Sequence, residues 1–172
     1  ERIDETRGIF WPCPSEDHPG TPRLFETRFH HPDGKARFHA VEHRDAPEMP
    51  DSDYPLVLTT GRVLQHYLTG VQTHRVKRLQ RECPEPFAQI HPELAGRHHI
   101  HHGQKIRLIS RRGEIVLSVR LSGDIRADTV FVPFHWGGAK SVNQITLDAW
   151  DPASKMPSFK HCAVRLERVV AA

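Results

Sequence analysis

The stretch PLVLTTGRVLQHYLTG, residues 55–70, decides the fold expected for this chain. Residues 56–58 form a short apolar run after a Tyr-Pro pair, which predicts a strand buried on both faces. Thr60 and Gly61 then allow a tight reversal, because glycine tolerates backbone conformations that other residues avoid. The threonine can also cap the backbone N–H groups that follow it. A short strand, a turn and the first turns of a helix are therefore expected here.

A ligand cradle is predicted where the expected strand meets the expected helix. A helix N-terminus presents unpaired N–H donors and the positive end of a dipole, which together favour a phosphate. Arg62 adds a planar fork that binds a phosphate or a heterocycle edge through two hydrogen bonds. His66 follows four residues later, on the same face of a helix. The pattern indicates an anion or cofactor site, with a purely structural turn as the alternative.

The bulk composition indicates one domain rich in turns. The chain has 172 residues, 14 prolines and 11 glycines, and its formal charge of +3 suits anionic ligands. That charge falls short of a nucleic-acid footprint, and no apolar run approaches the roughly 20 residues of a membrane helix. Neither nucleic acid nor a membrane is therefore expected as a partner. The first residue is Glu, so we expect a processed or partial polypeptide.

Cysteine usage indicates a reducing compartment. Cys13, Cys83 and Cys162 are odd in number and widely separated, so they form neither a close metal-binding pair nor a disulfide framework. We interpret them as buried free thiols in a cytoplasmic protein.

The N-terminal third is expected to be an arm and a linker, residues 1–53, ahead of a folded domain at residues 54–172. A Pro-Asp-Gly turn at 32–34 between the limbs 27–31 and 35–41 predicts a hairpin. Residues 42–53 contain five acidic residues and two prolines, which is typical of a solvated linker.

Six short strands and two small helices are expected in the folded domain. The strands are predicted at 56–58, 87–90, 105–110, 114–121, 130–133 and 162–169. The helices are predicted at 73–82 and 91–95, the second with proline at its first position. Short strands joined by small helical crossovers favour a compact, mostly β barrel over an open sheet.

Donor groups gather after two of the predicted strands. The FHWGG segment at 134–138 follows one strand, and the 60–66 segment follows another. The donors are Arg62, His66, His135, Trp136, Asn143 and Lys160. This set suits a flat, polar, phosphorylated ligand such as a nucleotide-bearing cofactor. Structural alternatives remain: Phe134 and Trp136 suit a core equally well, and Lys160 suits a solvated surface.

Two other charged or histidine-rich segments have plainer interpretations. His98, His99, His101 and His102 stand in one loop, whereas zinc ligands usually converge from separate elements. We interpret them as a polar loop, with a metal site as the alternative. The basic residues of segment 75–81 indicate a solvated helix face, with a phosphate or partner contact as the alternative. No motif of a complete catalyst is present, so the domain is predicted to bind rather than to catalyse.

Several segments together resemble a known family. They are residues 55–70, GQKIRLISRRG at 103–113, IRADTVFVPFHWG at 125–137 and LDAWDPASKMPSFKHCAVRLE at 147–167. Their combination resembles the C-terminal domain of the molybdenum oxidoreductases that carry two molybdopterin guanine dinucleotides, the dimethyl sulfoxide reductase superfamily. Within it the chain is most similar to the assimilatory nitrate reductases, and next to the formate dehydrogenases.

This resemblance implies a six-stranded double-psi β-barrel and a set of cofactor contacts. It implies that the turn after the first strand holds the phosphates of a dinucleotide or its pterin edge, and that later loops contact the pterin. The residues at these positions are Thr60, Gly61, Arg62, Val63 and His66, then His135, Trp136, Asn143, Phe159 and Lys160. Hydrogen bonds to a pterin also tune the electronics of its metal. One departure is His102, where the family usually has an acidic residue.

The resemblance also implies what lies outside this chain. A molybdenum-bis(molybdopterin guanine dinucleotide) cofactor would be shared with upstream domains that hold an iron–sulfur cluster and the metal ligand. An electron donor protein would supply the electrons for reducing nitrate to nitrite. The isolated domain is then expected to be inactive, with no catalytic or metal-ligating residue of its own. The alternatives are the same domain of a formate dehydrogenase and a stand-alone barrel that binds proteins or nucleic acid.

Overall fold

The computed structural model describes residues 2–169. Contacts divide the chain into two compact units, residues 1–43 and 44–172. The first unit contains one short helix, α1 (Arg2–Thr6), and otherwise turns and irregular backbone. None of the helices between residues 2 and 169 has the length and apolar character needed to cross a membrane.

The hairpin predicted in the first unit is present only as its turn. The Gly34 N–H donates to the His31 carbonyl at 2.8 Å, and the Phe29 N–H donates to the Gly34 carbonyl at 2.8 Å. The two limbs are not strands, so that part of the prediction is wrong. An isolated two-stranded hairpin is marginal in water without an apolar face to bury. Phe38, in the second limb, is 97% exposed.

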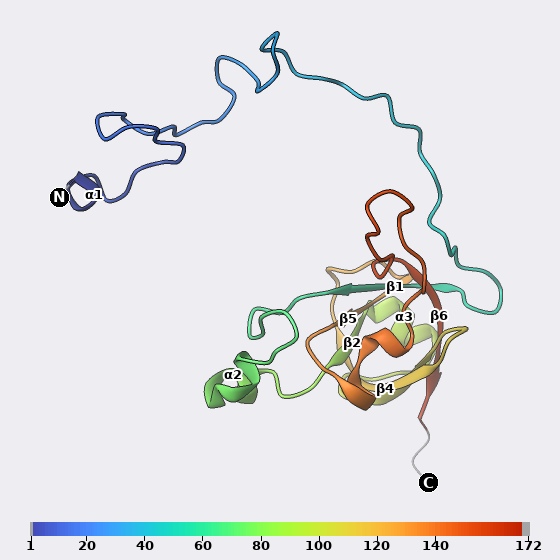
Figure 1. Ribbon diagram of the computed structural model, residues 1–172. Helices are drawn as coiled ribbons and strands as arrows, with labels where there is room; N and C mark the ends of the chain where they lie inside the picture. Colours follow the sequence, from blue (N-terminus) through green and yellow to red (C-terminus); the bar gives the residue numbers. More distant parts are fainter. Residues whose placement is uncertain (1, 170–172) are drawn as a thin grey trace. The chain divides into compact units, whose positions relative to one another are not determined.

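The second unit is a closed barrel of six strands (Figure 1). The strands are β1 (Leu56–Gly61), β2 (Phe87–Ile90), β3 (Lys105–Ile109), β4 (Glu114–Leu121), β5 (Thr129–Pro133) and β6 (Cys162–Arg168). The helices are α2 (Lys77–Glu82), α3 (Pro92–Arg97) and the 3-10 turns η1 (Thr73–Arg75), η2 (Gly138–Lys140) and η3 (Val142–Gln144). The predicted mostly β class and the six-stranded barrel are confirmed.

The order of strands around the barrel is β1-β5-β2-β4-β3-β6. Two neighbouring pairs, β1–β5 and β2–β4, are parallel, and the remaining four pairs are antiparallel. In the first parallel pair Gly61 lies opposite Pro133. Because parallel strands end at the same edge of a sheet, the loops that begin at Arg62 and Phe134 leave the barrel side by side.

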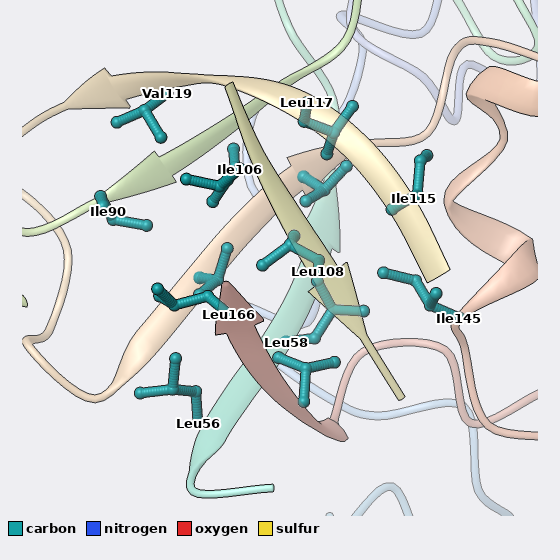
Figure 2. Close-up of a cluster of buried hydrophobic side chains, with 14 of the residues drawn as sticks. Leu56, Leu58, Ile90, Ile106, Leu108, Ile115, Leu117, Val119, Ile145 and Leu166 are labelled. Atoms are coloured by element: carbon teal, nitrogen blue, oxygen red, sulfur yellow. The ribbon is translucent and has the colours of Figure 1, made fainter. Parts of the chain in front are cut away.

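Alternating apolar side chains fill the barrel interior (Figure 2). Leu58, Ile106 and Leu108 are fully buried. The run 56–58, expected to be buried on both faces, is buried only at alternate residues, because successive side chains of a strand point to opposite faces and Val57 is partly exposed. Burying one such side chain contributes about 1.5–3 kcal/mol relative to leaving it exposed. Ile145, just after η3, joins the same cluster and packs into it near Ile115. The core therefore fixes one loop as well as the strands.

The helix predicted after β1 is not formed. The strand continues to Gly61, and residues 62–72 run through a series of turns. A side chain distant in sequence explains the difference, because His135 takes the Val63 N–H and the Leu68 carbonyl as its hydrogen-bond partners. Leu68 also has a left-handed backbone, with φ +46°, which a helix does not accommodate. The cradle expected from a helix N-terminus is therefore absent.

The acidic linker is anchored to the barrel through Glu48 and, by an ion pair with Arg111, through Asp51. The Glu48 side chain is 9% exposed and accepts hydrogen bonds from Arg111 at 3.0 Å and from Arg112 at 2.8 and 2.9 Å. It also accepts from the Ala163 N–H at 2.8 Å. The Arg112 guanidinium, opposed in part by burial, lowers the pKa of Glu48 from 4.5 to about 2. Segment 42–53 is thus not uniformly solvated.

This carboxylate is expected to make stability fall in acid. Its pKa is lower in the folded chain, so its contribution is complete above pH 4.5 and is lost as the pH falls through 2. At neutral pH the contribution is about 2–3 kcal/mol. Urea unfolding of the wild type and of Glu48→Gln should differ by that amount at neutral pH and converge toward pH 2. A difference that is constant with pH would contradict this assignment.

Candidate functional site

A pocket of about 570 Å³ opens beside the ends of β1 and β5. Its polar lining is Thr60, Thr69, Asn143, Thr146 and Asp148, and its apolar lining is Phe134, Leu147, Pro157 and Phe159. Aromatic and aliphatic side chains can cover the face of a flat heterocycle, while hydroxyl, amide and carboxylate groups bind its edge. The chemistry of the lining therefore suits a flat ligand with a polar rim.

Thr60 and Lys160 join two walls of this pocket. The Thr60 hydroxyl donates to the Phe159 carbonyl at 3.0 Å, and the Lys160 ammonium donates to the Thr60 carbonyl at 2.6 Å. The same ammonium lies 5.3 Å from the centre of the Phe159 ring and 5.7 Å from that of Phe134. An ammonium has three donors, so it can still bind an anion at the pocket rim.

Asn143 presents an available amide at the same pocket. It lies in η3, whose first turn is capped by the Ser141 hydroxyl accepting from the Asn143 N–H at 3.3 Å. The Asn143 side chain is exposed, and its amide forms no hydrogen bond with any residue between 2 and 169. One acceptor and two donors therefore remain for a ligand.

His135 supports the loop after β1 from beneath. It is fully buried; its Nδ1 donates to the Leu68 carbonyl at 2.6 Å and its Nε2 accepts from the Val63 N–H at 2.9 Å. This pattern requires the neutral ring, because a proton on Nε2 would face an N–H group. Burial also lowers the pKa of His135, which favours the neutral ring.

His66, in the middle of the same loop, connects it to the segment that follows. It is 4% exposed, and its Nε2 donates to the Cys83 carbonyl at 2.7 Å. Its Nδ1 then accepts from the Thr73 hydroxyl at 3.1 Å. Both rings thus use both nitrogens within the protein. We assign His66 and His135 a positioning role, and their predicted direct contact with a ligand stays a prediction.

Three further residues of the predicted site pack at the base of the loop. A Cβ at Gly61 would lie 2.4 Å from the Phe131 ring, so only glycine fits there. Val63 packs against a small cluster that contains Trp136, which is 9% exposed. The aromatic ring of Trp136 also lies 5.1 Å from that of His66. These residues shape the loop from within.

Arg62 is an exposed cation at the start of this loop. It follows β1 directly, and within residues 2–169 its guanidinium forms no ion pair. The loop ends at Gly70, which has a left-handed φ of +77° and where an added Cβ would lie 2.5 Å from the His74 ring, so a side chain is excluded. A rigid loop therefore holds an unpaired cation at the barrel edge, beside the residue that ends β1.

The structure brings only part of the predicted set to one pocket. Thr60, Asn143 and Phe159 line it and Lys160 lies at its rim, whereas the remaining predicted residues form or support the adjacent loop. Sequence reasoning missed Thr69, Thr146, Leu147, Asp148 and Pro157. No periodic pattern marks these positions. Thr146, Leu147, Asp148 and Pro157 lie close in sequence to Asn143 or Phe159, and Thr69 lies within the 55–70 stretch. In the described part of the chain no group of three or more potential ligands could hold a metal ion, the histidine-rich loop included.

Residues 56–163 match the family model described as "Molydopterin dinucleotide binding domain". The chain belongs to this family. The matched range includes β1 to β5, the first two residues of β6 and the whole pocket. The family implies a molybdopterin cofactor, and the residues present fit one: an unengaged amide, hydroxyls and a carboxylate for heterocycle edges, aromatic rings for their faces, and two cations for phosphate.

Curated relatives of this family member cover nearly all of the chain. The assimilatory nitrate reductase catalytic subunit of Bacillus subtilis (strain 168) is 48% identical over 167 residues, which is 96% of this chain and 24% of that protein. The F420-dependent formate dehydrogenase subunit alpha of Methanocaldococcus jannaschii is 44% identical over 162 residues, 94% of this chain and 24% of that protein. The chain thus spans about a quarter of the length of these relatives.

A solved structure shares the fold. Acetylene hydratase from Pelobacter acetylenicus matches with a TM-score of 0.60 and 20% sequence identity, over 67% of this chain and 18% of that chain. At this identity the likeness concerns the fold alone.

Proposed function

We propose that this chain is the cofactor-clamping domain of a molybdenum oxidoreductase that carries two molybdopterin guanine dinucleotides, and that the parent enzyme reduces nitrate to nitrite. The observation that carries the proposal is the pocket at the shared edge of β1 and β5. There Asn143 and Lys160 retain unused donors, and Phe134 and Phe159 offer ring faces. Family membership supplies the class of ligand.

Each pocket residue has a role in this proposal. Asn143 and Asp148 bind the polar edge of a pterin or guanine ring, and Phe159 covers its face. Arg62 and Lys160 neutralise phosphate, to which charge-assisted hydrogen bonds are strong. The bound cofactor supplies the two-electron chemistry, while this domain orients it and excludes water from its edge.

Nitrate is proposed as the substrate because the nitrate reductase subunit is the more similar of the two relatives, at 48% against 44% identity. Formate oxidation is the second candidate, supported by the formate dehydrogenase likeness over 94% of the chain. An iron–sulfur cluster, the metal ligand and the contact with an electron donor are proposed for the three quarters of such a protein that this chain does not span. Three free cysteines favour a cytoplasmic location.

A stand-alone nucleic-acid-binding barrel has one supporting feature, the exposed basic side chains of α2. One of these, Arg78, already pairs with Glu82 at 3.1 Å. Family membership favours a cofactor instead. Steep salt-dependent binding of the protein to DNA would reverse this preference.

The proposal is tested on the complete protein, purified from its own host. We expect two guanine nucleotides per molybdenum after acid release, and nitrate-dependent oxidation of a reduced viologen dye. Formate-dependent dye reduction without nitrate turnover would support the second candidate. Protein that carries neither pterin nor guanine nucleotide would refute the cofactor-binding role.

A further inference from the structure

Glu48 connects the segment before the barrel to both walls of the pocket. Its carboxylate receives four hydrogen bonds, from Arg111, twice from Arg112 and from the Ala163 backbone. The side chain is only 9% exposed, so these contacts are largely shielded from water. Charge-assisted hydrogen bonds of this kind are stronger than neutral ones.

Glu48 is linked to one wall of the pocket, residues 145–148, through Arg112. The terminal nitrogen that donates to Glu48 at 2.9 Å also donates to the Ile145 carbonyl at 3.3 Å. Ile145 is fully buried in the barrel core and directly precedes the lining residues Thr146 and Leu147 (Figure 2). Arg112 therefore links this wall of the pocket to Glu48 through shared hydrogen bonds.

Glu48 contacts the opposite wall, residues 159–163, directly. The Glu48 carbonyl lies 3.1 Å from Nδ1 of His161, and its carboxylate accepts from the Ala163 N–H at 2.8 Å. These two residues follow Phe159 and Lys160, which line and rim the pocket. The two walls meet where the Leu147 N–H donates to the Cys162 sulfur at 3.1 Å.

We propose that Glu48 is a positioning residue that sets the spacing between the 145–148 and 159–163 walls, so that the acidic segment before the barrel belongs to the cofactor-binding machinery. The inference rests on the proposed function for its ligand. Without Glu48 the Arg112 fork loses two of its three hydrogen bonds, and the two wall segments lose the residue that contacts both.

Arg111 provides the matched control. It binds the same carboxylate at 3.0 Å, and it also contacts Asp51 and the Tyr54 ring, but it reaches neither wall. If Glu48 acted only as a general stabiliser, Arg111→Ala would have the same consequences as Arg112→Ala. If it positions the walls, only Arg112→Ala would disturb the pocket.

The first experiment measures hydrogen exchange in complete protein purified from cells that cannot make the pterin. In Glu48→Gln and Arg112→Ala, the Leu147 amide should exchange about tenfold faster, the equivalent of one lost hydrogen bond. Amides of β2 and β5 that exchange by local opening, and so do not report global unfolding, should keep the wild-type rate, as should all amides outside the linker in Arg111→Ala. Unchanged exchange at Leu147 in both wall variants would overturn the inference, whatever the ligand.

The second experiment measures release of the bound cofactor from the complete, loaded protein well below its unfolding temperature. The release rate of guanine nucleotide should rise about tenfold in Glu48→Gln and Arg112→Ala and stay unchanged in Arg111→Ala. Arg112→Lys, which keeps the charge and loses the fork, should release at an intermediate rate. Equal release from all variants would overturn the inference. A wild type without cofactor would refute the proposed function and leave the exchange result to decide the positioning role.

Discussion

Replacing His135 with phenylalanine is expected to destabilise the barrel by about 2–4 kcal/mol, because two partly buried backbone groups would lose their hydrogen-bond partner. The ring holds the Val63 N–H and the Leu68 carbonyl, and it is fully buried. Each orphaned group costs about 1–3 kcal/mol. Phenylalanine keeps the ring volume, so lost packing contributes little to this change. Urea unfolding followed by far-ultraviolet circular dichroism measures the difference.

Two further variants divide this loss between the two bonds. The amide nitrogen of asparagine can occupy the position of Nδ1 and keep the bond to Leu68, whereas the amide oxygen of glutamine can occupy that of Nε2 and keep the bond to Val63. His135→Asn and His135→Gln should therefore each lose about half as much stability as His135→Phe. A phenylalanine variant as stable as the wild type would show that the histidine is not the support of this loop.

The same residue explains why the barrel could be predicted from the sequence while the loop could not. Barrel strands carry their own signal, since alternation such as that of Ile106 and Leu108 marks one buried face. The 62–70 loop has no local signal of this kind. Its backbone partners come from a side chain some 70 positions away, and a helix is the default expectation without it.

The candidate site, like the fold, could be predicted only in part from the sequence. Thr60, Asn143, Phe159 and Lys160 were found because donors and aromatics follow predicted strands or match family motifs. The wall residues Thr146 and Asp148 lie in irregular backbone, whose course depends on Ile145 entering the core. The contacts that anchor Glu48 could not be predicted either, because its partners lie more than 60 residues away in the sequence.

Arg62→Ala is expected to lower the cofactor content of the complete protein about tenfold or more while leaving the stability of the barrel within about 0.5 kcal/mol of the wild type. The guanidinium is exposed and has no acidic partner in the described part of the chain, so its removal costs the fold little. A charge-assisted bond to phosphate contributes about 1.5–3 kcal/mol, which corresponds to roughly 10–100-fold in affinity. Guanine nucleotide and molybdenum are quantified per polypeptide after purification.

Arg81→Ala is the control, because Arg81 is also an exposed arginine but lies on α2, away from the pocket lining. It should retain the full cofactor content, whereas Arg62→Lys should fall between the alanine variant and the wild type, since lysine keeps the charge but not the two-pronged geometry. Full cofactor content in Arg62→Ala would remove the guanidinium from the binding site. The exposed guanidinium on the loop that His66, His135 and Gly70 support would then need another explanation.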